Sequence, residues 1–76
     1  MEYIWEAKLD GKYKCTVTRF NKRGGTLRVE DTEAGKMLLE QDVGLAYGAQ
    51  FGPDIDDVDK WESICVAVVD RNQKNA

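Results

Sequence analysis

The chain has 76 residues, a third of them charged, and its formal net charge at pH 7 is −3. A chain of this length forms a single domain, residues 1–76, whose one modest core leaves no room for a deep cleft between two lobes. It contains no apolar run of about 18 residues that would span a membrane, and its first residues lack the basic and apolar regions of a signal peptide. We therefore expect a cytoplasmic, intracellular protein without a membrane partner.

Apolar and polar side chains alternate along roughly the first forty residues. Successive side chains of a strand point to opposite faces, so this alternation predicts one sheet with one apolar face. The apolar side chains occupy odd positions, namely Tyr3, Trp5, Ala7, Tyr13, Cys15, Val17, Leu27, Val29, Met37 and Leu39. Ile4 and Leu38 break the pattern. Both fall on the outer face of an expected edge strand, where a partner or another segment would have to cover them.

Turn-forming residues divide this part of the chain into four strands. The strands are expected over about 2–8, 13–19, 26–30 and 36–43. In the first hairpin, a two-residue turn at Asp10-Gly11 would mix apolar and charged side chains on each face. A three-residue loop over 9–11 keeps the faces separate and places Ala7 opposite Tyr13, so we choose it.

The later strands are joined by two glycine-containing turns. Glycine suits such turns because it adopts positive φ without steric cost. In the expected register, Leu27 faces Val17 and Val29 faces Cys15. Three short connections in succession predict an antiparallel meander whose strands lie in the order 1-2-3-4. Residues 44–53 then predict an irregular crossover, anchored to the core by its large side chains, Leu45, Tyr47 and Phe51.

An α-helix is expected over about 54–71, with Asp54 as its N-cap and a frayed tail over 72–76. Apolar side chains recur there at helical spacing, at Ile55, Val58, Trp61, Cys65, Val68 and Val69. A competing prediction is a short helix followed by a strand, since 64–69 is a continuous run rich in β-branched residues. We favour the full helix because it supplies the second layer that a one-sided sheet requires. The predicted fold is α+β: a four-stranded antiparallel β-meander with one C-terminal α-helix packed on one face.

Few residues of the chain are suited to catalysis or to metal binding. There is no histidine, the side chain that most often transfers protons near neutral pH. Cys15 and Cys65 are interpreted as buried, reduced thiols that pack as small hydrophobes, with a disulfide between sheet and helix as the alternative. We therefore expect a non-enzymatic protein with no catalytic residue, no metal and no cofactor.

Charge is unevenly distributed along the chain. Residues 1–28 carry seven Lys or Arg and three Asp or Glu, a net of +4. Residues 29–76 carry four Lys or Arg and eleven Asp or Glu, a net of −7. The simplest interpretation is that the two halves neutralise each other in a small globule, but such asymmetry also marks partner surfaces.

Acidic side chains cluster around the expected start of the helix. The candidate partner-binding residues are Asp56, Asp57, Asp59 and Glu62. None of them is needed to fill the core, and together they create a negative potential that steers a basic partner. The simpler interpretation is helix capping combined with a solvated face. The spacing does not match a calcium-binding loop.

Basic side chains give an alternative site on the outer face of the sheet and its turns. They are Lys12, Lys14, Arg19, Lys22, Arg23 and Arg28. Such cations contact phosphates, and proteins that bind single strands add exposed aromatic rings on which bases stack. Phe20 is the only aromatic residue expected beside these cations, because the others are assigned to the core.

These observations predict a small protein-interaction module that acts through its acidic surface on a protein partner with a basic surface. One concrete form is an inhibitor of a nucleic-acid-binding complex, of the accessory type carried by phages or mobile elements. The alternative is a nucleic-acid-binding module that uses the basic outer sheet face. Pairing of two copies through an edge strand, which would give a homodimer, is also compatible with the sequence.

Overall fold

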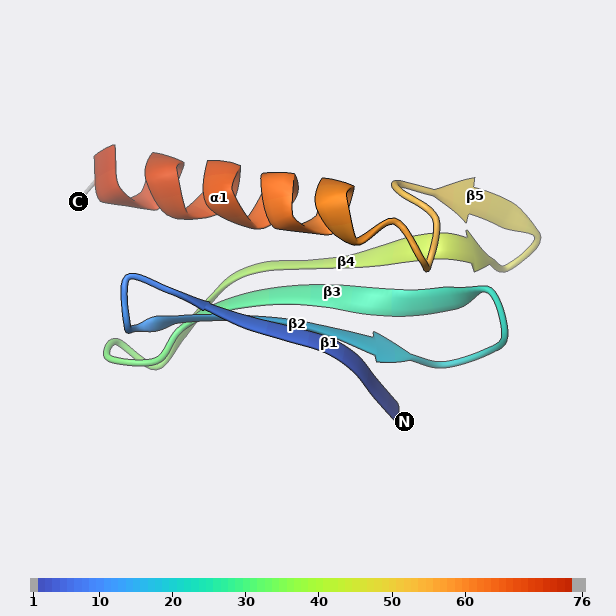
Figure 1. Ribbon diagram of the computed structural model, residues 1–76, viewed down its shortest axis with the longest axis horizontal. Coiled ribbons are helices and arrows are strands. Elements are labelled where there is room, and N and C mark those ends of the chain that lie inside the picture. Colours follow the sequence, from blue (N-terminus) through green and yellow to red (C-terminus); the bar gives the residue numbers. More distant parts are fainter. Residues whose placement is uncertain (1, 75–76) are drawn as a thin grey trace.

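A computed structural model describes residues 2–74 and shows an antiparallel sheet covered by one helix (Figure 1). The elements are β1 (Glu2–Leu9), β2 (Tyr13–Arg19), β3 (Gly24–Asp31), β4 (Lys36–Ala46), β5 (Ala49–Phe51) and α1 (Val58–Lys74). The strands pair in chain order, β1-β2-β3-β4-β5. The predicted α+β fold with an antiparallel sheet and a C-terminal helix is confirmed, but these residues form five strands rather than four.

The fifth strand belongs to a hairpin in the segment where a crossover was expected. β4 turns at Tyr47 and Gly48 directly into β5. Both turn residues have positive φ, 53° and 77°, as a two-residue hairpin of the primed type requires. The prediction that large side chains anchor 44–53 to the core is therefore wrong. The side chains in question are all exposed: Leu45, Tyr47 and Phe51.

β-Bulges in β1 and β4 change the faces on which Ile4 and Leu38 lie. The pairing of β1 with β2 shifts between Tyr3 and Trp5, and the pairing of β4 with β3 shifts next to Met37. A bulge sets two residues against one on the neighbouring strand, so the alternation of faces is reversed beyond it. Ile4 and Leu38 consequently pack against the core instead of facing outward. Tyr3 and Met37 change face in the opposite sense and are exposed.

The first hairpin combines features of both turns considered from the sequence. Leu9 lies opposite Tyr13, so the loop consists of the three residues between them. Asp10 and Gly11 both have positive φ, as the two-residue turn would require, and Lys12 is the added residue. The register therefore differs by two residues from the expected one. A shift of two keeps every side chain on its own face, so the predicted apolar face survives.

The helix begins later than expected, at Val58, and Asp57 rather than Asp54 is its N-cap. The Asp57 Oδ1 atom accepts a hydrogen bond from the backbone N–H of Lys60 at 3.4 Å. Asp54 belongs to the preceding turn, in which its carbonyl oxygen accepts a hydrogen bond from the Asp57 N–H at 3.0 Å. The helix continues through 64–69, because burial of its apolar stripe outweighs the β-propensity of that run.

The core lies between α1 and the inner face of the sheet. Its buried side chains are Tyr13, Cys15, Val17, Leu27, Val29, Val43, Trp61, Cys65 and Val69. Val17 lies opposite Leu27 and Cys15 opposite Val29, as the alternation predicted. Trp5 is only partly buried, and its ring centroid lies 6.0 Å from that of Trp61. The core occupies one face of the helix and leaves the opposite face to solvent.

Candidate functional site on the outer face of the helix

The side of α1 that faces away from the sheet carries a shallow hollow of about 500 Å³. Six exposed side chains line it: Asp59, Glu62, Ser63, Val66, Ala67 and Asp70. Their spacing of three and four residues places them on one side of a helix, opposite the buried stripe of Trp61, Cys65 and Val69. We call these six residues the outer helix face.

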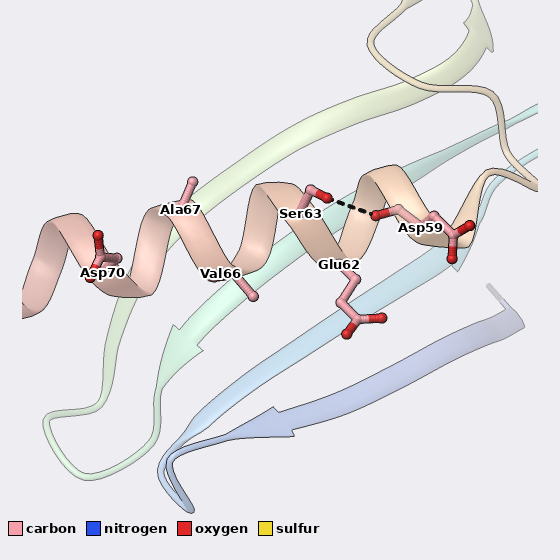
Figure 2. A pocket seen from close by; sticks show the side chains of 6 residues that line it. All are labelled: Asp59, Glu62, Ser63, Val66, Ala67 and Asp70. Carbon is pink, nitrogen blue, oxygen red and sulfur yellow. Dashed lines mark hydrogen bonds between the residues drawn. The ribbon is translucent and has the colours of Figure 1, made fainter.

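The centre of the outer helix face is small and weakly apolar. Figure 2 shows Ser63, Val66 and Ala67 between Asp59 at one end and Asp70 at the other. Val66 exposes 50% of its surface, although a valine at a purely solvated helix position contributes neither charge nor good helix propensity. The Ser63 hydroxyl donates a hydrogen bond to the Asp59 carbonyl oxygen at 3.0 Å. That hydroxyl is thus committed to the helix backbone.

Carboxylates surround this centre. Asp70 lies 3.3 Å from the Lys74 ammonium group, and both side chains are largely exposed, so the pair contributes little to stability. Asp59 and Glu62 form no ion pair within the described residues. The outer helix face therefore presents an apolar centre with negative charge on its margins.

The acidic residues expected to bind a partner do not all meet on this face. Asp59 and Glu62 belong to it. Asp57 caps the helix and lies 3.8 Å from the Lys60 ammonium group. Asp56 precedes the helix and lines a separate hollow. The sequence prediction did not include Asp70 or the apolar centre. The signal that indicates them is helical spacing: Val66 follows Asp59 by seven residues, and Asp70 follows Ser63 by seven.

The basic residues proposed for the outer sheet face are dispersed. Lys14 pairs across strands with Glu30. The Arg28 Nε atom donates to Glu40 at 2.7 Å, and its Nη1 atom donates to Thr18 at 3.0 Å. Lys14 and Arg28 thus each have a carboxylate across from them, although Lys14 also lies opposite Lys8 on β1, so cations and carboxylates alternate on this face.

The remaining cations lie at opposite ends of the sheet. Lys12 lies in the β1–β2 turn, with its ammonium group 5.1 Å from the Tyr13 ring centroid and 3.9 Å from Glu33. Tyr13 raises the pKa of Lys12, and Asp31 and Glu33 add to this effect. The other three, Arg19, Lys22 and Arg23, belong to β2 and the β2–β3 turn at the far end.

The two thiols form a contact between sheet and helix rather than a reactive site. Cys15 on β2 and Cys65 on α1 are free, fully buried and in contact with each other. The contact with Cys15 and burial raise the pKa of Cys65, whereas the contact with Cys65 lowers the pKa of Cys15. Because the thiolate is the nucleophilic form of cysteine, this arrangement opposes nucleophilic chemistry at Cys65.

The fold and its surface define a small α+β protein with an acidic helix face. Comparison with family models, with curated proteins and with solved structures found no match. Within residues 2–74, no helix has the length and apolar character needed to cross a bilayer, and no three His, Cys, Asp or Glu side chains are grouped to hold a metal ion. Its function has to be inferred from the geometry of its own residues.

Proposed function

We propose that the protein is a small non-enzymatic interaction module whose outer helix face binds the basic surface of an intracellular protein partner. The observation that carries this proposal is the combination of a half-exposed Val66 with carboxylates at Asp59, Glu62 and Asp70 on one side of the helix. Protein interfaces typically join an apolar centre to a polar rim, and charged rims steer association.

The spacing of the carboxylates helps to choose between kinds of basic partner. Asp59 and Asp70 are separated by three helical turns, about 17 Å at 1.5 Å per residue. Over that distance the face carries three carboxylates, whereas duplex DNA carries about one charge per 1.7 Å. The face is therefore a sparse substitute for a phosphate backbone. The geometry favours a partner that also buries Val66 over an inhibitor that acts by charge mimicry alone.

Charge reversal on the outer helix face tests the proposal. Wild-type protein is immobilised beside Asp59→Lys/Glu62→Lys, and the proteins retained from a native lysate are identified and then measured by titration. We expect the variant to bind its purified partner at least tenfold more weakly, which corresponds to about 1.4 kcal/mol. Val66→Asp should weaken binding as well, because it places a charge at the apolar centre.

A matched control makes the same change in net charge at a different place on the surface. Glu6→Lys/Glu33→Lys alters two exposed carboxylates on β1 and in the β3–β4 turn, away from the outer helix face. This variant should bind the partner as wild type does. Equal affinity of all variants that fold, judged by circular dichroism, would show that the acidic face is only solvated.

A further inference from the structure

Three solvent-exposed aromatic side chains lie close together at the end of the sheet farthest from the β1–β2 turn. Phe20 follows β2, Tyr47 lies in the β4–β5 turn, and Phe51 ends β5. The Tyr47 ring centroid lies 6.2 Å from that of Phe20 and 6.4 Å from that of Phe51. Tyr47 exposes 85% of its surface, and each of the other two exposes 38%. We call these three residues the aromatic end.

Close backbone contacts fix the aromatic end in place. The Leu45 N–H donates to the Arg23 carbonyl oxygen at 2.8 Å, which joins the β2–β3 turn to β4. A side chain at Gly24 would approach the Leu45 carbonyl oxygen to 2.5 Å and the Phe20 ring to 3.0 Å. A side chain at Gly44 would overlap the Arg23 carbonyl oxygen. These glycines let the β2–β3 turn approach β4, which brings Phe20 next to the β4–β5 hairpin.

Tyr47 has a backbone conformation that is sterically unfavourable for a large side chain. Its φ of 53° lies in the left-handed region, where a bulky residue is a steric outlier and glycine or asparagine is usual. The ring is also the most exposed large apolar side chain among the described residues. A tyrosine is not favoured by this turn, and its ring is not buried in the fold. Binding of a ligand over the ring would explain why a tyrosine occupies this position.

Three cations lie beside these rings. Lys22 and Arg23 make no ion pair with the side chains that the structure describes, and Arg19 lies across from Glu2 on β1. The Arg19 Nη1 atom donates to the Lys22 carbonyl oxygen at 2.7 Å. The Asn21 Oδ1 atom accepts hydrogen bonds from the N–H groups of Arg23 and Gly24 at 2.8 and 2.7 Å. The turn is therefore well ordered and presents three positive charges next to Phe20.

We propose that the aromatic end binds single-stranded nucleic acid, with bases stacked on Tyr47 and its neighbours and phosphates held by the β2–β3 turn. Exposed rings beside cations are the combination that single-strand binders use, since every base offers a stacking face and every nucleotide a phosphate. A duplex keeps its bases stacked inside, so it would offer these rings no partner. This surface is separate from the outer helix face, and the inference does not depend on the protein partner proposed above.

Carboxylates on the helix side of the turn set a limit on the affinity. Asp54 and Asp56 line a hollow of about 340 Å³ together with Arg23. Their charges oppose phosphate binding at that margin. We therefore expect binding that is moderate, strongly dependent on salt, and improved by Asp54→Asn/Asp56→Asn.

Fluorescence anisotropy with a short labelled oligothymidine tests the aromatic contribution. Tyr47→Gly removes the ring while relieving the backbone strain, so the hairpin should stay folded, and circular dichroism of the variant verifies this. We expect it to weaken binding by about tenfold, within the range for loss of one stacked base. Tyr47→Phe keeps the stacking surface and should bind as wild type does. Equal binding by wild type and Tyr47→Gly, or equal binding to a duplex, would overturn the proposal.

A second pair of variants tests the cations. Lys22→Glu/Arg23→Glu should weaken binding and flatten its dependence on salt, whereas Lys8→Glu/Lys36→Glu, an equal charge change away from the aromatic end, should have a much smaller effect. No binding of oligothymidine by wild type even at low salt would refute the inference. A concentration-dependent dimer that Tyr47→Gly dissolves would also refute it, because a second copy of the chain would then be the occupant of the aromatic end.

Discussion

Burial should make the thiols of Cys15 and Cys65 unreactive in the folded protein. Both side chains are fully buried, and the contact with Cys15 together with burial raises the pKa of Cys65. We expect neither thiol to react rapidly with a thiol reagent in the folded protein, and both to react once denaturant exposes them. A time course of labelling with and without denaturant measures this. Rapid modification of either cysteine under native conditions would contradict the packing of α1 on β2.

The two tryptophans should contribute unequally to stability. Trp61 is buried to 1% exposure, whereas Trp5 on the edge strand is only partly covered. Truncation of a fully buried tryptophan costs about 3–5 kcal/mol, so Trp61→Ala should remove much of the stability of a small domain. Trp5→Ala should cost less, about 2 kcal/mol in proportion to its burial. Urea unfolding of both variants measures their free energies of unfolding. A larger decrease for Trp5→Ala than for Trp61→Ala would contradict the observed core.

At the scale of elements, the alternation of apolar residues was enough to predict the sheet and its inner face. It could not reveal a bulge, because one extra residue such as Ile4 or Leu38 leaves only a local break in the pattern. β5 was missed because Tyr47 is an unusual residue for a position with positive φ. The outer helix face was predicted only in part, because Asp59 and Glu62 lie near the helix start whereas Asp70 lies three turns beyond Asp59.

The start of α1 offers a direct test of helix capping. Asp57→Ala removes the side chain that accepts the Lys60 N–H, and we expect a loss of about 1 kcal/mol. For a domain of this size that loss lowers the Tm by roughly 4–8 °C. Asp56→Ala, one residue earlier and exposed, should change stability by less than about 0.5 kcal/mol. Thermal melts followed by circular dichroism compare them, and a greater loss for Asp54→Ala than for Asp57→Ala would assign the cap to Asp54 instead.

At the scale of the whole molecule, the open edges of the sheet carry features that discourage pairing with another sheet. β1 has a bulge at Ile4 and exposed charges at Glu6 and Lys8. β4 has a bulge at Leu38, and β5 covers only its last residues, from Gly44 onward. Bulges and charged side chains are the usual means by which edge strands avoid association. We therefore expect the strand edges not to pair, so that the edge-to-edge homodimer that the sequence left open does not form.

We accordingly expect the isolated protein to sediment as a monomer at micromolar concentration. Glu6→Val/Lys8→Val removes both charges from the β1 edge and raises its β-propensity, so this variant should associate as its concentration rises. Lys60→Val, an apolar substitution at an exposed helix position, serves as the control and should remain monomeric. Sedimentation equilibrium distinguishes these outcomes. A wild-type dimer that persists in Tyr47→Gly and is unaffected by salt would show that the strand edges do pair, and that the bulges in β1 and β4 do not protect them.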